Sequence, residues 1–206
     1  MSKEHVPDES CNTNYQWGPR AYKGVSNMVY MTLTKEMENM LKSIINSTFI
    51  SYERDDYGIS TYGNFRINTD KISIEVTNLE KVVPFIEDEE EVAGFECQIV
   101  DKNTKFSPYC ITGSAEVKVG SLIKEIEIVN DSICINDGEY EISFDQAIII
   151  KTETKTIMFS RSAWFSETIS IREHDDYDSI YPVSDERELF ENEDMNKVKI
   201  TRTRRK

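Results

Sequence analysis

Five consecutive acidic residues form the densest group of charge in the sequence: Glu87, Asp88, Glu89, Glu90 and Glu91. Like charges in a row repel one another, and no hydrophobic periodicity here buries any of them. Water can relieve this repulsion, and so can the cationic groups of a partner. The run therefore predicts either a solvated surface that aids solubility or the acidic half of a binding site for a basic protein.

A second distinctive segment begins at Arg161 and places Trp164 and Phe165 side by side. In a strand, consecutive side chains point to opposite faces, so one of these rings must face away from the core. In one interpretation Trp164 covers a sheet edge and Phe165 is buried. In the other, Trp164 and Arg161 form a binding hot spot, because tryptophan and arginine are enriched at such sites.

Carboxylates gather again just after His174. Asp175, Asp176 and Asp178 are weak candidates for holding calcium or magnesium, which are hard cations that prefer oxygen ligands. Their spacing lacks the alternating acid and glycine pattern of an EF-hand loop, so a solvated acidic loop is the favoured interpretation. We therefore expect no metal site and no cofactor.

Cysteine and histidine are too few and too scattered for several kinds of catalysis. The four cysteines form no C-x-x-C pair, and the two histidines, His5 and His174, lie far apart in the sequence. Phosphate-binding loops, the nucleophile elbow and the H-E-x-x-H zinc pattern are also absent from the sequence. A carboxylate- or metal-dependent hydrolase stays open, because 38 acidic residues offer many pairs. Nothing selects one pair among them.

The charge balance describes the kind of partner to expect. The chain has 206 residues, 24 basic and 38 acidic, for a net charge of −14. Such a surface repels nucleic acid and anionic lipid and favours a basic protein partner. The basic residues of segment 197–206 are the exception, and they leave nucleic-acid contact open there alone. The sequence does not predict an oligomeric state.

One amphipathic helix is expected near the N-terminus. Thr32 or Thr34 can cap it, and hydrophobic residues recur after the cap at helical spacing. They are Leu33, Met37, Met40, Leu41, Ile44 and Ile45. This pattern is typical of a helix that covers a sheet with one face.

From Thr48 onward the hydrophobic period changes to two, which predicts about ten strands. Val117 and Val119, Ile126 and Ile128, and Ile133 and Ile135 are read as separate strands among them. Asn136-Asp137-Gly138 has the composition of a hairpin loop, with glycine where a positive φ is needed. Ala147 to Ile150 is continuously apolar and is expected to form a central strand buried on both faces, with Ile157 and Phe159 paired to it. Val198 and Ile200 suggest the last strand, and a short helix is expected between Asp185 and Phe190.

These elements predict a strand-dominated α+β protein, with a largely antiparallel sheet, open barrel or sandwich. The expected division is a disordered leader over residues 1–30, one domain over 31–200 and a basic flexible tail over 201–206. The N-terminus lacks the apolar stretch of a signal peptide, and the longest aliphatic run is four residues, Ala147 to Ile150. The expected location is therefore the cytoplasm, without membrane contact.

A non-enzymatic binding protein for a basic partner is the function that the sequence favours. In general character the chain resembles bacterial immunity proteins, antitoxins and other stoichiometric inhibitors, although it shares no specific motif with them. Two alternatives are a carboxylate- or metal-dependent hydrolase and a structural or phage-type component that associates with itself through sheet edges.

Overall fold

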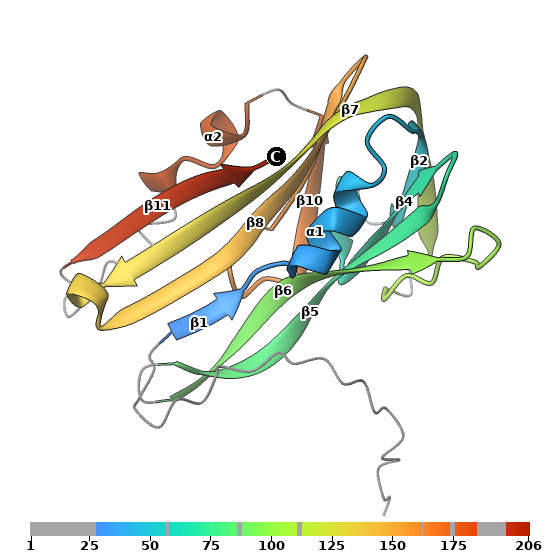
Figure 1. The fold of residues 1–206 in the computed structure, drawn as a ribbon. Helices are drawn as coiled ribbons and strands as arrows, with labels where there is room; N and C mark the ends of the chain where they lie inside the picture. The colour runs from blue at the N-terminus through green and yellow to red at the C-terminus, as the bar shows by residue number, and fades with distance from the viewer. Residues whose placement is uncertain are drawn as a thin grey trace, which may run out of the picture.

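The computed structural model describes residues 28–206 except for 57, 86–87, 111–112, 162, 174–175 and 185–196. Over these residues the protein is a strand-dominated α+β fold (Figure 1). Its strands are β1 (Met28–Met31), β2 (Thr48–Asp55), β3 (Ser60–Tyr62), β4 (Asn64–Thr69), β5 (Ser73–Phe85), β6 (Asp88–Val100), β7 (Ser114–Ile135), β8 (Tyr140–Thr152), β9 (Thr156–Arg161), β10 (Thr168–Glu173) and β11 (Val198–Arg205). Its helices are α1 (Lys35–Lys42), α2 (Tyr177–Ile180) and the single 3-10 turn η1 (Asn136–Gly138).

The strands form one largely antiparallel sheet of eleven strands in the described part of the chain, as the hydrophobic alternation predicts. Nine of them follow the order β3-β10-β9-β8-β7-β2-β4-β5-β6. β11 adds to β7, and β1 adds to β8 as a parallel strand. In Figure 1, α1 lies between the part of the sheet that contains β7 and β8 and the long β5–β6 ribbon.

β7 joins the two parts of the sheet because it is long enough to pair with both. Its first part pairs with β2 and its second part with β8, over 22 residues in all. A bulge interrupts the pairing with β2 between Phe49 and Ser51. Gly120 lies on the bulged side with a φ of 65°, which glycine adopts without strain. The sequence predicted separate strands here, and the structure corrects this to one bent strand.

α1 begins where the sequence predicts it. The Thr34 side chain accepts a hydrogen bond from the Met37 backbone N–H, which identifies Thr34 rather than Thr32 as the N-cap. Met37 and Leu41 are buried, and both belong to the main hydrophobic core. The helix therefore covers the sheet with its apolar face, as expected from the spacing.

The core forms around the central strands. Ala147, Ile148, Ile149 and Ile150 of β8 are all buried, which confirms the central strand expected there. Ile148 and Ile150 face the main core, whereas Ala147 and Ile149 pack with Tyr177 of α2 in a smaller cluster. A third cluster, around Phe144 and Trp164, includes residues of β1 and β11. The hairpin turn is also confirmed, with Gly138 at a φ of 99°.

Both expected domain limits need correction. Residues 28–30 lie in β1, paired with β8, so they are not part of a disordered leader. Residues 201–205 are not a flexible tail either, because β11 pairs with β7 as far as Arg205. Residues 1–27 and the helix expected between Asp185 and Phe190 lie outside the described residues. Among the helices of the described part, none is long and apolar enough to span a membrane.

Candidate interaction surface

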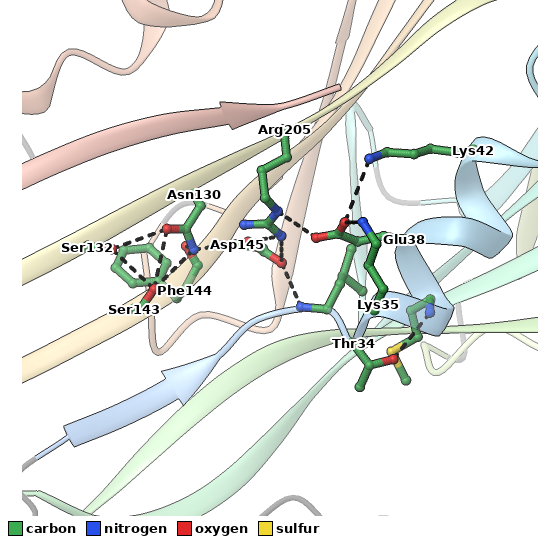
Figure 2. A network of polar contacts seen from close by, with 12 residues as sticks. Thr34, Lys35, Glu38, Lys42, Asn130, Ser132, Ser143, Phe144, Asp145 and Arg205 are labelled. Carbon is green, nitrogen blue, oxygen red and sulfur yellow. Dashed lines mark hydrogen bonds and ion pairs between the residues drawn. The ribbon is translucent and has the colours of Figure 1, made fainter.

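A network of polar contacts surrounds Arg205 of β11 (Figure 2). Arg205 donates two hydrogen bonds to the fully buried Asp145 carboxylate, at 2.8 and 2.9 Å, and one to Glu38 of α1 at 2.6 Å. Asp145 also accepts from the backbone N–H of Leu33, which precedes the helix, at 2.7 Å. One carboxylate thus ties β8, β11 and the start of α1 together.

The opposite face of β11 repeats this arrangement. Arg202 donates to both oxygens of the buried Asp131 at 2.8 and 2.7 Å, and Arg204 binds the buried Glu127. Both arginines also contact Asp178 of α2. Burial opposes ionisation of Asp178, but hydrogen bonds and charge from the two arginines outweigh it and lower its pKa.

This network accounts for the weak metal candidates. Asp178 is held by arginines, and the Asp176 side chain accepts from the Asp178 backbone N–H as the cap of α2. Asp175 lies outside the described residues. No group of side chains suited to a metal ion occurs among the described residues. The carboxylates that surround β11 are occupied by its own arginines, so their evident role is to hold that strand on the sheet.

The structure corrects the expectation that Arg161 and Trp164 form an exposed hot spot. Arg161 has no exposed surface, and its guanidinium donates to the backbone carbonyls of Ala93 and Asp145. Trp164 is only 7% exposed and packs in the cluster around Phe144. The other interpretation is wrong too, because it buried Phe165, which is 53% exposed. These residues lie in a turn after β9, where strand alternation no longer applies.

Phe165 comes from a turn that hydrogen-bonds to Gly63, just after β3, and to Asn78 of β5, and three more exposed apolar side chains come from this region. Tyr62 is 40% exposed, Tyr109 52% and Val82 59%. Three carboxylates accompany them. We call this group the acidic aromatic surface and define it by seven residues: Tyr62, Glu80, Val82, Glu91, Tyr109, Phe165 and Glu167. Exposed aromatic rings next to charged groups are the composition of protein-binding hot spots.

The part of this surface on β3 is held by a buried carboxylate. Asp55, at the end of β2, accepts a hydrogen bond from the Tyr62 backbone N–H at 2.9 Å and is itself fully buried. Gly63 follows with a φ of 75°, and a Cβ there would lie 2.9 Å from the Tyr109 ring. The Tyr109 ring therefore packs directly on the glycine backbone, which fixes its position beside Tyr62.

Backbone hydrogen bonds hold the turn that carries Phe165. The Trp164 carbonyl accepts from the Ala93 N–H, and the Glu167 carbonyl accepts from the Gly63 N–H, both at 3.2 Å. The buried Asn78 side chain donates to the Ser166 carbonyl at 2.8 Å. The turn is therefore hydrogen-bonded to β5, to β6 and to the residue that follows β3. This fixes the backbone at Phe165, which lowers the entropy cost of binding a partner there.

The three carboxylates of the surface are linked to one another and to Tyr62. Glu167 accepts hydrogen bonds from the Tyr62 hydroxyl and from the Glu80 backbone N–H. The bond to Glu167 raises the pKa of Tyr62 to about 12. Glu80 and Glu91 lie on the same face of the β5–β6 ribbon, and hydrogen bonding with Glu91 together with its charge raises the pKa of Glu80. A cationic group placed here would remove the repulsion between these two carboxylates.

The predicted acidic run meets this surface at one end. Glu91 is exposed and lies opposite Val82 in the β5–β6 ribbon. Asp88, Glu89 and Glu90 continue β6, but only their backbone is described, and Glu87 lies outside the described residues. Reasoning from the sequence missed Glu80 and Glu167, which are isolated acids along the chain. Only the pairing of strands brings them together.

Comparisons with family models, with curated proteins and with solved structures find no match for this chain. The fold and the acidic aromatic surface are therefore the grounds on which a function is proposed.

Proposed function

We propose that this protein is a non-enzymatic binding protein that engages a basic protein partner through the acidic aromatic surface. The observation that carries the proposal is the grouping of three exposed aromatic rings with three linked carboxylates on one rigid base. The rings supply apolar area for tight contact, and the carboxylates select a cationic partner. The net charge of −14 favours the same kind of partner over nucleic acid.

Within this class, we propose a stoichiometric inhibitor of the immunity or antitoxin kind, acting in the cytoplasm. The general character of the chain supports this form, because a small acidic protein with a preformed binding surface suits the neutralisation of a basic enzyme. Complementary charge would speed the encounter with such an enzyme. The hydrolase and the self-associating component remain predictions from the sequence.

Site-specific photo-crosslinking tests the proposal. A photoreactive residue at position 165 is compared with one at Ile50, which is exposed on β2, in a lysate of the organism that encodes the protein. We expect one basic protein to crosslink from position 165 but not from position 50. Adding the purified protein should then abolish the activity of that partner at equal molar amounts.

A matched charge control sharpens the experiment. Glu80→Gln with Glu91→Gln should reduce crosslinking from position 165, whereas Glu36→Gln with Glu139→Gln should not, although both pairs change the net charge equally. Glu36 and Glu139 are exposed acids outside the surface. Crosslinks that are the same from both positions, or a captured partner that is acidic, would contradict the proposed function.

A further inference from the structure

Unlike Glu167, the side chains of Glu80 and Glu91 receive no hydrogen bond or ion pair from a basic side chain or a backbone N–H among the described residues. Each comes from a different strand of the β5–β6 ribbon, and both side chains are exposed. The β5–β6 register nevertheless places them on the same face of the ribbon, because Glu91 lies opposite Val82 and Glu80 is two residues before Val82. Two like charges in this position repel each other, and a cation placed between them would relieve that repulsion.

Both carboxylate oxygens of Glu167 already accept hydrogen bonds within the protein. One of its oxygens accepts from the Tyr62 hydroxyl and the other from the Glu80 backbone N–H, at 3.3 Å. It therefore ties the Tyr62 hydroxyl to the backbone of Glu80. The result is a pair of carboxylates with an aromatic ring held beside it.

A pair of carboxylates beside an aromatic ring suits the guanidinium of arginine better than the ammonium of lysine. A guanidinium is flat, donates in two directions at once and stacks on aromatic rings, whereas an ammonium is a compact and strongly hydrated point charge. Bridging two carboxylates while covering a tyrosine ring uses all three properties of the guanidinium. The exposed Tyr109 ring packs on Gly63, next to Tyr62, and the exposed Phe165 is two residues before Glu167, so both add apolar area near this pair.

We propose that the acidic aromatic surface accepts an arginine side chain of the partner, with its guanidinium bridging Glu80 and Glu91 and lying against Tyr62. This inference rests on the proposed function and adds the chemistry of the anchoring residue. Burying such an arginine among aromatic rings would make it a hot spot of the complex.

Two short peptides test the inference without knowledge of the partner. Acetyl-Gly-Arg-Gly-amide and acetyl-Gly-Lys-Gly-amide are titrated into the full-length protein, and the side-chain carboxyl and aromatic NMR signals are followed. We expect saturable shifts at Glu80, Glu91 and Tyr62 with the arginine peptide, and about tenfold weaker binding of the lysine peptide. Glu91→Gln should weaken the arginine peptide by about tenfold, while Glu36→Gln should leave its affinity unchanged.

Three results would overturn the inference: equal binding of both peptides, equal effects of the two glutamine variants, or no saturation with the arginine peptide. Each of them leaves the proposed function standing if position 165 still crosslinks to a basic partner. Conversely, selective binding of the arginine peptide with no such crosslink would support the proposed arginine-binding site and count against the proposed function. Glu80 and Glu91 are exposed, so their replacement should not disturb the fold.

Discussion

Arg161 is the largest of the fully buried side chains, and its surroundings explain how the fold tolerates a buried positive charge. Besides its bonds to backbone carbonyls, the guanidinium lies 5.2 Å from the ring centres of both Phe95 and Phe144. Carbonyl oxygens and the faces of aromatic rings are both electron-rich, so the protein replaces part of the water that the charge has lost. Arg161 thereby connects β6, β8 and β9.

Replacing Arg161 by methionine should therefore destabilise the fold by about 3 kcal/mol, because buried carbonyls lose their donors. Arg172→Met is the matched control, since Arg172 is exposed and lies 6.0 Å from the Tyr181 ring. We expect its cost to stay within about 1 kcal/mol. Urea denaturation of both variants measures the difference, and equal losses would show that Arg161 does not hold the strands together.

Trp164 and Phe165 should behave in opposite ways when each is replaced by alanine. Trp164→Ala removes a buried ring and should cost about 3–5 kcal/mol of stability. Phe165→Ala should change stability by less than about 0.5 kcal/mol, because the ring is exposed. Once a partner is known, Phe165→Ala should weaken its binding by about 2 kcal/mol. Thermal unfolding and partner binding, measured on the same samples, check both predictions. A loss of stability in Phe165→Ala and a loss of binding alone in Trp164→Ala would show that the buried and exposed roles are assigned wrongly.

For single residues, strand alternation is informative as far as the end of β9. Ile157 and Phe159 were expected to pair with the central strand, and they do, at Ile150 and Ile148. The same period of two carries Arg161 onto the inner face, although its charge suggested the surface. Alternation ends with β9, so it held no information on Trp164 and Phe165. Their orientation depends on hydrogen bonds that the turn makes with distant strands.

At the scale of elements, β11 depends on charge as well as on strand pairing. Strand pairing places Arg202 directly opposite Asp131 of β7. Arg205 is on the other face and reaches Asp145 and Glu38. A segment that is basic in sequence therefore becomes an integral strand, because the neighbouring strands supply buried carboxylates to match it. The sequence alone left open whether these residues fold back onto the acidic body.

Arg205→Gln should destabilise the protein by about 3 kcal/mol at neutral pH, because the buried Asp145 loses its cation. Lys206→Gln is the matched control: Lys206 is exposed, and its single ion pair, to Glu125, spans 3.2 Å. We expect that variant to lose less than about 1 kcal/mol. Guanidinium denaturation at high ionic strength would mask the difference, so urea is the denaturant to use.

The effect of Arg205→Gln should also depend on pH. Burial works against ionisation of Glu38, but the Arg205 charge and hydrogen bonds from Lys35 and Arg205 prevail and lower its pKa below the ordinary 4.5. A lowered pKa stabilises the folded state above 4.5, and this contribution is lost as the pH falls through the lowered value. The difference in the free energy of unfolding between wild type and the Arg205→Gln variant should therefore become smaller at acidic pH. Parallel curves across the whole pH range would contradict a stabilising role for this pair.

The hydrophobic pattern was sufficient to predict most helices and strands. It was not sufficient to predict that several predicted strands form the single long strand β7. It predicted α1, the hairpin at Gly138 and the buried centre of β8, because burial on one face or two leaves a direct trace in the sequence. It divided β7 into several strands, because the bend near Gly120 interrupts the alternation. The acidic aromatic surface was not predictable in this way, since its members come from β3, β5, β6 and two turns.

For the whole molecule, folding redistributes the charge. The arginines of β11 neutralise carboxylates of β7, β8 and α2, so that end of the sheet carries matched charges. The β5–β6 ribbon, in contrast, carries Glu80 and Glu91 together with Asp88, Glu89 and Glu90 of the predicted acidic run. A basic partner approaching from a distance would be drawn toward this ribbon, because steering follows the uneven distribution of charge rather than its sum.

This distribution leads to a kinetic prediction. Replacing Glu87, Glu89 and Glu91 by glutamine should slow association with a basic partner by about tenfold at low salt and weaken its salt dependence. Thermal stability should stay nearly unchanged or rise slightly, because the variant relieves repulsion. A control variant replaces Glu36, Glu139 and Glu153, three exposed acids outside the surface, and changes the net charge equally.

The comparison of association and dissociation rates separates steering from anchoring. The control should slow association less, because its charges lie away from the docking surface, and Phe165→Ala should mainly speed dissociation. All four proteins should associate at similar rates at high salt, where charges are screened over about 10 Å or less. If the two triple variants slow association equally, the acidic run acts only through net charge. An unchanged rate in the Glu87, Glu89 and Glu91 variant would remove the run from the binding site and leave it a role in solubility.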